Sequence, residues 1–279
     1  MVPAYITWTM DPVAFHLGAF AVRWYSLFLV LSLFICYAFL RKIFLREGRP
    51  VDAIVSYGLM IIAGLIIGGR LVHCLFYEPA HYLQHPIDII KPWTGTLGKD
   101  AVFIGFQGMS GHGSAIGIVL AILINSRRVK IPAIWMIDRI ALFGPLIGFW
   151  TRIGNFFNSE ILGTPSDLPW AVAFLRKGFI PRHPVQLYEA AAYALIFVIA
   201  YRYYLRKAGH EKPGEILGFV LVLVYVARFF IEFFKAPQAA VENDLFLTMG
   251  QILSIPFILT GLFLLLRPAG WQFKVKKHP

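Results

Sequence analysis

The sequence IALFGPLIGFWTRIGNFFNSEILG, residues 140–163, joins an apolar run directly to a polar cluster. Residues 140–150 carry no charge, and residues 151–163 then bring an arginine, two asparagines and a glutamate in quick succession. The whole chain is 58% hydrophobic and only 15% charged, whereas charged residues make up about a quarter of an ordinary soluble domain. An apolar run that ends in such a cluster indicates a membrane span with a polar site at its end.

Apolar runs recur along the 279 residues. A transmembrane helix needs about 20 mostly apolar residues, and seven segments come near that length, of which residues 110–125 form the shortest. We expect spans at residues 22–40, 53–77, 110–125, 132–151, 184–202, 215–235 and 249–267. The sequence therefore predicts an all-α integral membrane protein with seven transmembrane helices, in which residues 1–279 form a single polytopic membrane domain. Residues 81–101 contain two prolines and are expected to form an extramembrane or interfacial loop.

The distribution of Lys and Arg among the loops predicts the orientation. These residues concentrate in residues 41–49, 126–130, 202–212 and 267–277. By the positive-inside rule this side is cytoplasmic, so we expect a periplasmic N-terminus and a cytoplasmic C-terminus. The same rule accounts for the net charge of +11 without a nucleic-acid partner.

With that topology, the polar residues of the spans lie at one depth, in the outer half of the membrane. They are Tyr25, Arg70, His112, Arg152, Glu189, Arg228, Glu232 and Gln251. Ionisable side chains inside a bilayer usually face a bundle interior or a wet cavity, so their shared level predicts one polar cavity open toward the outer face. Residues 152–183 are expected to form a small periplasmic cap that contains the polar cluster.

Several of these motifs also have a structural interpretation. Residues 151–163 could be a capped helix end with a polar turn, although they carry more polar groups than one helix end requires. Arg228 and Glu232 are spaced i, i+4 and can pair with each other, although the planar guanidinium also suits a phosphate. Arg70 could serve only as a packing partner of Glu189 or Glu160.

The glycine-rich segments leave two interpretations open. His112 lies in QGMSGHGSAIG, residues 107–117, where the glycines let the backbone approach a ligand, but a lone histidine is as often a structural group. Gly64 and Gly68 have the spacing of close helix packing. The eight histidines and two cysteines are scattered, so we expect no metal site.

Seven stretches carry a resemblance to a known family. They are RWYSL (23–27), GGR (68–70), GHG (111–113), RIGNFFNSEILG (152–163), RHPVQLYE (182–189), RFFIEFFK (228–235) and MGQILSIP (249–256). In this order, and over most of the chain, they resemble the bacterial prolipoprotein diacylglyceryl transferases.

The resemblance implies a multi-pass enzyme of the bacterial plasma (inner) membrane. Such an enzyme moves the sn-1,2-diacylglyceryl group of phosphatidylglycerol to the lipobox cysteine of a prolipoprotein, forms a thioether and releases glycerol 1-phosphate. This is the first step of lipoprotein maturation. The implied partners are phosphatidylglycerol, the prolipoprotein signal peptide with its lipobox cysteine, and membrane lipid. No cofactor is expected.

The resemblance also implies most of the site residues. We expect a catalytic set of His112, Arg152, Arg228 and Glu160 and a substrate-binding set of Tyr25, Arg152, Asn155, Asn158, Gly163, Arg228, Glu232 and Arg70. All of these except Asn158 and Arg70 fall on positions that the family treats as functional. Three positions depart from the family pattern: Thr151 and Ser114 replace glycines, and Tyr225 stands three residues before Arg228 instead of four.

The chemistry needs two kinds of group. The reaction is a displacement at an sp3 carbon, so it forms no tetrahedral oxyanion. The incoming thiol must lose its proton, for which the imidazole of His112 is the candidate base. The departing phosphate must be stabilised, for which Arg152 and Arg228 are the candidates. Asn155 and Glu160 would orient the headgroup or an arginine.

Two other classes of protein compete with this interpretation. A lipid or solute transporter would use the arginines to bind an anionic substrate, but the sequence has no detectable inverted repeat, and its polar residues avoid the midplane. A membrane protease or acyltransferase would need a nucleophile, a zinc set or an HxxxxD pattern, and none is evident in the sequence.

Overall fold

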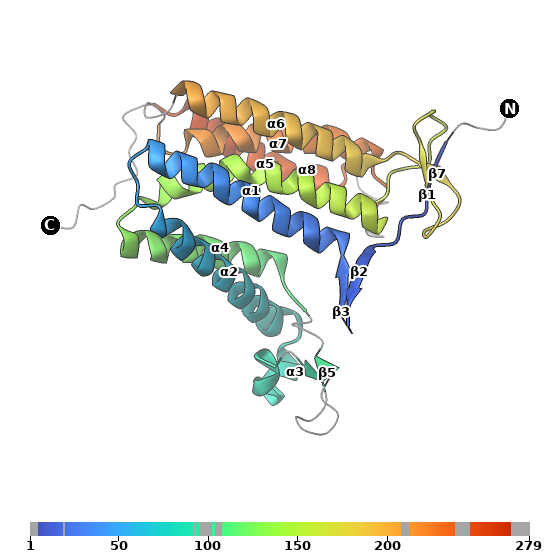
Figure 1. The fold of residues 1–279 in the computed structure, drawn as a ribbon, viewed down its shortest axis with the longest axis horizontal. Helices are drawn as coiled ribbons and strands as arrows, with labels where there is room; N and C mark the ends of the chain where they lie inside the picture. Colours follow the sequence, from blue (N-terminus) through green and yellow to red (C-terminus); the bar gives the residue numbers. More distant parts are fainter. Residues whose placement is uncertain are drawn as a thin grey trace. The chain divides into compact units, whose positions relative to one another are not determined.

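A computed structural model describes residues 5–18, 20–91, 93–94, 102–103, 108–207, 212–237 and 246–268 (Figure 1). The chain divides into two compact units, one of Met1–Lys42 with Ile137–Pro279 and the other of Ile43–Met136. Parts of three expected segments lie outside the described residues. These are residues 95–101 of the interfacial loop, residues 208–211 of a basic loop and the basic residues 269–277.

The first unit is built mainly from long helices that run alongside one another (Figure 1). They are α1 (Trp24–Arg46), α5 (Ala133–Asn158), α6 (Val185–Lys207), α7 (Glu215–Ile231) with the 3₁₀ turn η3 (Glu232–Phe234), and α8 (Met249–Leu266). Helix α7 packs against both α6 and α8. The rings of Phe39, Phe143 and Phe197 join α1, α5 and α6, with centroids 5.6–6.3 Å apart, so aromatic packing holds this part together.

Short strands lie at one end of these helices. Strand β1 (Ile6–Trp8) pairs in parallel with β6 (Val172–Phe174), which pairs antiparallel with β7 (Pro181–Arg182). Strands β2 (Val13–Leu17) and β3 (Phe20–Arg23) form an antiparallel hairpin that leads into α1. Val172 and Phe174 are buried against Phe156 of α5, so this sheet is anchored on the end of α5. Of the segment expected to form a small cap, residues 152–158 belong to α5, and β6 and β7 contribute two strands to this sheet.

The second unit centres on a pair of helices. It contains α2 (Asp52–Val72), the π-helical turn η1 (His73–Tyr77), α3 (Pro79–Gln84), η2 (Pro86–Ile89), the two-residue strands β4 (Trp93–Thr94) and β5 (Val102–Phe103), and α4 (Gly111–Val129). Within the described part of residues 81–101, the elements are short, and none is long enough to cross a membrane. The extramembrane or interfacial position of this loop stays a prediction.

Glycines allow α2 and α4 to approach closely. A Cβ on Gly64 would lie 2.4 Å from the carbonyl oxygen of Gly117, and one on Gly68 would lie 2.3 Å from that of Gly113. The predicted close packing at Gly64 and Gly68 is confirmed. Ser114, which departs from the family pattern, donates a hydrogen bond to the Leu65 carbonyl at 3.0 Å and so ties the two helices together.

The apolar surfaces of the helices fit a membrane. Within the described ranges, five helical segments are long and apolar enough to cross one: Trp24–Arg46, Asp52–Tyr77, Ala133–Asn158, Glu215–Phe234 and Met249–Leu266. Helix α8 exposes Ile252, Leu253, Ile255, Phe257, Leu259, Leu262, Phe263 and Leu266. Such a continuous apolar face is costly in water but not in lipid. Helices α4 and α6 overlap the other two expected spans. Their polar residues make them less apolar than these five segments.

The fourth expected span ends later than the sequence predicted. Its apolar run stops near residue 151, but α5 continues to Asn158, so the first part of the polar cluster is helical. The helix ends where Ser159 adopts a left-handed φ of 54°, with the Glu160 amide donating to the Asn155 carbonyl at 2.9 Å. The fall in hydrophobicity near residue 151 shows where the polar surroundings begin. The helical hydrogen bonds of the backbone nevertheless continue until the left-handed Ser159.

Candidate functional site

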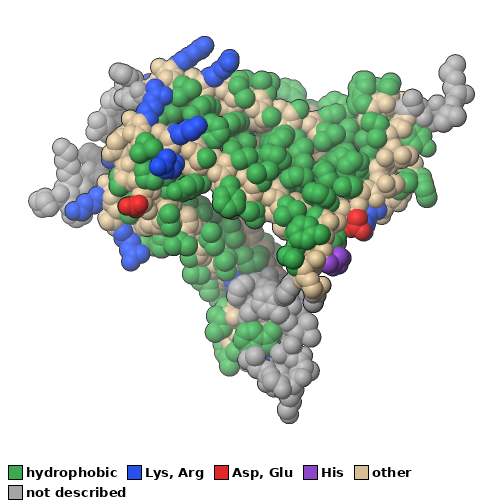
Figure 2. Space-filling model, viewed as in Figure 1, with side chains coloured by type: hydrophobic (Ala, Val, Ile, Leu, Met, Phe, Trp, Pro, Cys, Tyr) green, Lys and Arg blue, Asp and Glu red, His purple; other side chains and the backbone are tan. Residues whose placement is uncertain are grey.

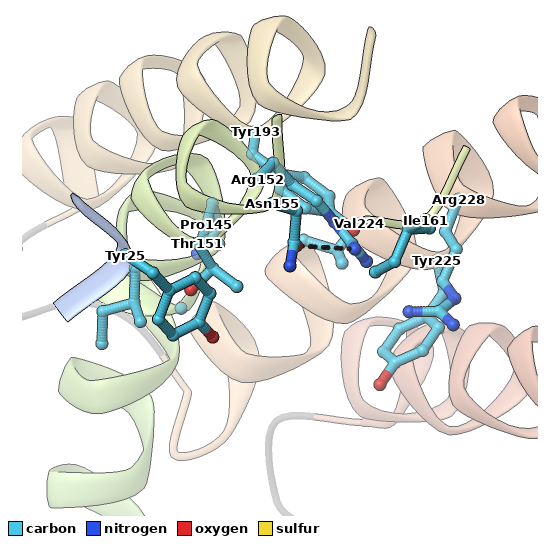
Figure 3. Close-up of a pocket in the computed structure, with 13 residues that line it drawn as sticks. Tyr25, Pro145, Thr151, Arg152, Asn155, Ile161, Tyr193, Val224, Tyr225 and Arg228 are labelled. Carbon is cyan, nitrogen blue, oxygen red and sulfur yellow. Dashed lines mark hydrogen bonds between the residues drawn. The ribbon is translucent and has the colours of Figure 1, made fainter. Parts of the chain in front are cut away.

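A pocket of about 500 Å³ lies within the first unit (Figure 3). Its wall is formed by Tyr25, Gly144, Pro145, Ile147, Gly148, Thr151, Arg152, Asn155, Ile161, Tyr193, Val224, Tyr225 and Arg228. The expected site residues Tyr25, Arg152, Asn155 and Arg228 are therefore brought together from α1, α5 and α7. The volume is in the range of small-ligand sites.

The amides of the polar cluster hold one carboxylate. Asn155 donates from Nδ2 to Oε2 of Glu160 at 3.0 Å, and Asn158 donates from Nδ2 to Oε1 at 3.2 Å. Arg152 donates from Nη1 to Oδ1 of Asn155 at 3.3 Å (Figure 3). The last turns of α5 thus place three polar side chains in a chain of hydrogen bonds that reaches the carboxylate of Glu160. A helix end that is only capped would not need this chain of hydrogen bonds.

The turn after α5 is strained. Both Ser159 and Ile161 have a φ of 54°, which is a rare conformation for a residue with a side chain and especially for a β-branched one. Gln186 of α6 holds the turn by donating to the Glu160 carbonyl at 2.6 Å. Ile161 lies in the wall of the pocket. Because such strain persists only where the surroundings enforce it, the turn places Glu160 and Ile161 in defined positions.

Arg152 is held from behind by a buried carboxylate. Its Nε lies 2.8 Å from Oε2 of Glu189, whose side chain is fully buried in α6. The other carboxylate oxygen of Glu189 lies 3.0 Å from Nζ of Lys235. Lys235 in turn lies 2.9 Å from Oε2 of Glu232. An ion-pair network therefore runs from the 3₁₀ turn η3 to the wall of the pocket.

Of the two interpretations that the spacing of Arg228 and Glu232 left open, the structure does not show the mutual ion pair. The two residues are spaced for pairing, but Glu232 binds Lys235 instead, because the chain turns from α7 into η3 at Glu232. In the part of the chain that the structure describes, the guanidinium of Arg228 has neither a hydrogen bond nor an ion pair. Arg228 thus adds an uncompensated positive charge to the pocket wall.

Aromatic side chains define the rest of the pocket. The ring of Tyr225 stacks on Phe257 of α8, with centroids 4.3 Å apart, and Figure 3 places it beside Arg228. Tyr25 opens α1 and packs on Gly154, where an added Cβ would lie 2.6 Å from Cδ2 of the tyrosine ring. Tyr25 and Tyr225 therefore each have a fixed ring in the wall.

Gly163 occupies a position without room for a side chain. An added Cβ would lie 2.3 Å from the His183 carbonyl oxygen and 2.9 Å from that of Phe234. Its own carbonyl accepts a hydrogen bond from Nη1 of Arg182 at 3.0 Å, and its backbone forms a bridge with Lys235. Gly163 thus lets three backbone segments meet behind the pocket, and it is not part of the pocket wall.

His112 and Arg70 belong to the second unit. His112 is exposed in the first turn of α4, and among the described residues its imidazole has no hydrogen-bond partner. Arg70 is 7% exposed and donates to the carbonyls of Ile89 at 2.8 Å and Asp88 at 2.6 Å. The roles of both residues stay predictions, as does a chamber shared by His112 with the arginines of the first unit.

Sequence reasoning did not assign Glu189, Lys235 or Tyr193 to the site. Glu189 was recognised as polar and at the right depth, but its contact with Arg152 depends on how α5 and α6 pack. Lys235 appears in the sequence only as the last residue of the stretch RFFIEFFK (228–235). Its position three residues after Glu232 was the one available signal. Gln251, by contrast, completes a capping box with Thr248 at the start of α8.

Metal ligands do not gather anywhere in the described ranges. No group of three or more His, Cys, Asp and Glu side chains there is placed to hold a metal ion.

The comparisons with known proteins agree with one another. A family model described as prolipoprotein diacylglyceryl transferase matches residues 12–267. The phosphatidylglycerol–prolipoprotein diacylglyceryl transferase of Tolumonas auensis is 41% identical over 263 residues, which cover 94% of this chain and 97% of that protein. The protein of the same name from Chloroherpeton thalassium is 43% identical over 264 residues, 94% of each chain. That of Bacteroides fragilis is 33% identical over 258 residues, 92% of this chain and 93% of that protein.

Proposed function

The chain belongs to the prolipoprotein diacylglyceryl transferase family, and from that premise we propose that its pocket binds the headgroup of phosphatidylglycerol during transfer to a prolipoprotein. The enzyme moves the sn-1,2-diacylglyceryl group of phosphatidylglycerol to the thiol of the lipobox cysteine. The product is a thioether, and glycerol 1-phosphate is released. This is the first step of bacterial lipoprotein maturation.

The reaction is a substitution at carbon. The sulfur of the cysteine attacks the glyceryl CH₂ group that carries the phosphate, forming a C–S bond. The C–O bond to the phosphate breaks, and its electron pair leaves with glycerol 1-phosphate. The proton of the thiol passes to a base. The protein must therefore bind a phosphodiester, stabilise the negative charge that gathers on it, and accept one proton.

The observation that carries the proposal is the pair of arginines in one pocket wall. Arg228 is uncompensated among the described residues, while Arg152 already neutralises Glu189. The two guanidiniums of the wall give it positive charge, which suits the negative charge of a phosphodiester. Guanidinium also offers paired donors to phosphate oxygens. Arg152 and Arg228 are thus assigned to the phosphate, and they stabilise it more strongly as it leaves.

The remaining residues of the first unit are assigned supporting roles. Glu160, with Asn155 and Asn158 bound to its carboxylate, can accept hydrogen bonds from the glycerol hydroxyls of the headgroup. Tyr25 provides an aromatic wall and a hydroxyl at the same pocket. These neutral and acidic groups favour a polyol headgroup over a second anion.

Glu232 and Gly163 act behind the pocket. Glu232 holds Lys235, and Gly163 lets the backbone of the turn approach closely. Arg70 lies in the second unit, and its substrate-binding role is retained as a proposal.

His112 is the proposed base. Its exposed imidazole has no hydrogen-bond partner in the described chain, so its ring nitrogen is available to a thiol. General-base catalysis by a positioned imidazole contributes about 10²–10⁴-fold to a rate. This assignment requires that His112 and the arginines share one chamber in the enzyme.

The proposed membrane arrangement has seven spans, a periplasmic N-terminus, a cytoplasmic C-terminus and a periplasmic cap at residues 152–183. Figure 2 shows hydrophobic side chains over the helices of the first unit and most of the visible Lys and Arg side chains near one end of that face. This pattern is typical of a membrane protein with its basic end in the cytoplasm. The pocket would then lie toward the outer leaflet. Because both substrates are anchored in the membrane, we expect openings between spans at that depth.

The test is direct transfer. Purified protein is incubated with phosphatidylglycerol labelled in its glycerol backbone and with a peptide that carries a lipobox cysteine. The expected product is a peptide with a labelled thioether, formed together with glycerol 1-phosphate and abolished when the cysteine is replaced by serine. Absence of a thioether product would overturn the proposed function. Movement of phosphatidylglycerol between leaflets without any product would favour a transporter.

A further inference from the structure

Lys235 belongs to the ion-pair network that it forms with Glu189, Glu232 and Arg152. The backbone around Lys235 is hydrogen-bonded to the segment that follows the polar cluster. Lys235 follows η3, where the Ala236 amide donates to the Leu162 carbonyl at 3.0 Å and the Thr164 amide donates to the Phe234 carbonyl at 2.9 Å. The chain after α7 is thus hydrogen-bonded on both sides of Lys235 to the segment that follows the strained turn. A residue tied in this way cannot shift independently of that turn.

The ammonium of Lys235 lies between two carboxylates. Its Nζ is 3.0 Å from Oε1 of Glu189 and 2.9 Å from Oε2 of Glu232, and its side chain is only 5% exposed. Glu232 is confined from the other side, because its carboxylate lies over Gly250, where an added Cβ would be 2.2 Å from Oε1. Lys235 is not in the pocket wall, so it has no route of contact with a substrate there.

Glu189 divides its two oxygens between two cations. Oε1 faces Lys235, and Oε2 lies 2.8 Å from Nε of Arg152. A carboxylate with both oxygens available prefers to bind an arginine through two parallel hydrogen bonds. Here Oε1 lies beside Lys235, Nε of Arg152 lies beside the other oxygen, and Nη1 of Arg152 donates to Oδ1 of Asn155 at 3.3 Å.

We infer that Lys235 is a positioning residue of the transferase: by occupying one oxygen of Glu189, it prevents that carboxylate from chelating Arg152 and so keeps the guanidinium in the pocket wall, where the phosphate binds. The inference rests on the proposed role of Arg152. A role limited to stability is the alternative, because a buried ion-pair network also affects folding. The two roles differ in what happens when the charges of Lys235 and Glu189 are removed together.

The experiment compares purified enzymes in the transfer assay and in thermal unfolding. Lys235→Met is expected to lower kcat about 100-fold, the size of loss that a misplacement of about 1 Å causes, with little change in KM for phosphatidylglycerol. Lys235→Arg should restore most of kcat, because it keeps a cation between the two carboxylates. The matched control is Lys207→Met, which removes the lysine of a second Lys–Glu pair, with Glu215, away from the pocket; its kcat should stay at the wild-type value.

The decisive variant is Glu189→Gln combined with Lys235→Met. It removes the carboxylate that would chelate Arg152, so its kcat should be about tenfold higher than that of Lys235→Met alone, a gain of about 1.4 kcal/mol in transition-state stabilisation. If Lys235→Met does not fold, Lys235→Gln takes its place in both enzymes. Wild-type kcat in the single variant, or a double variant as slow as the single one, overturns the inference. Absence of product from wild-type enzyme and the Lys207→Met control would instead overturn the proposed function.

Discussion

Arg70 and Arg228 occupy similar places in the sequence but have opposite surroundings in the structure. Each lies in the last turn of an apolar helix, Arg70 in α2 and Arg228 in α7. The guanidinium of Arg70 donates to backbone carbonyls of the segment that follows α2 and lies over the ring of Tyr82, 5.0 Å from its centroid. Arg228 lies in a pocket wall and, among the described residues, has no ion pair.

The difference shows how an arginine near the end of an apolar helix can be assigned to a structural or to a ligand-binding role. Carbonyl groups that bind Arg70 satisfy its donors and fasten a loop to a helix, which is a structural use of the charge. Arg228 instead lies in the wall of a pocket of about 500 Å³, where its unused donors are available to a ligand, and a planar guanidinium suits a phosphate. What distinguishes the two roles is how many N–H donors of the guanidinium already bind other protein groups, and not how deep the arginine lies in the membrane.

The largest effect is expected at Arg228. Arg228→Lys keeps the charge but loses the planar fork that binds two phosphate oxygens. We expect kcat/KM to fall about 10³-fold, the upper range for removing one stabilising donor group, without a matching fall in Tm. Transfer of labelled lipid to a lipobox peptide measures the rate. A variant with the wild-type rate would show that a point charge is sufficient at this position.

His112→Gln comes second and tests the second unit. Glutamine keeps a polar side chain but cannot accept a proton, so transfer should slow about 100-fold if the imidazole is the general base. The rate is measured over a range of pH, because an added thiolate fraction at high pH should recover part of the loss. A near-normal rate at neutral pH would exclude His112 as the base and leave proton transfer to another group.

A smaller effect is expected at Gly163. The methyl group of Gly163→Ala would meet the His183 and Phe234 carbonyl oxygens, so the turn that carries Glu160 must shift by a fraction of an ångström. We expect the rate to fall about tenfold, less than for a displacement of about 1 Å, together with a lower Tm. Gly58→Ala in α2 is the control, because nothing lies within 4 Å of its Cβ position. Equal behaviour of the two variants would contradict this reading of Gly163.

The smallest effect on transfer is expected at Arg70. Arg70→Met leaves the carbonyls of Asp88 and Ile89 without their donor, and each lost hydrogen bond to a charged group costs about 1.5–3 kcal/mol. We expect a clearly lower Tm but a rate close to wild type. If KM for phosphatidylglycerol rises while Tm is unchanged, Arg70 binds substrate, and the contrast with Arg228 disappears.

The membrane class of this protein could be predicted because hydrophobicity along the chain is a property of residues alone. Apolar runs of span length and the polar cluster after residue 150 needed no knowledge of packing, and the family followed from short motifs such as RIGNFFNSEILG. The ends of the helices could be predicted less well. Helix α5 continues to Asn158, because backbone hydrogen bonds, and not the polarity of side chains, decide where a helix ends.

The sequence by itself determined that Arg152, Asn155, Glu160 and Arg228 were candidates, since polar groups in apolar surroundings need a reason. Only the tertiary structure decided their partners. Spacing along one helix suggested that Glu232 pairs with Arg228, yet Glu232 binds Lys235 and Glu189 binds Arg152. Ion pairs depend on distances of a few ångströms between elements far apart in the chain. Such distances are set by how α5, α6 and η3 pack, which the order of residues does not state.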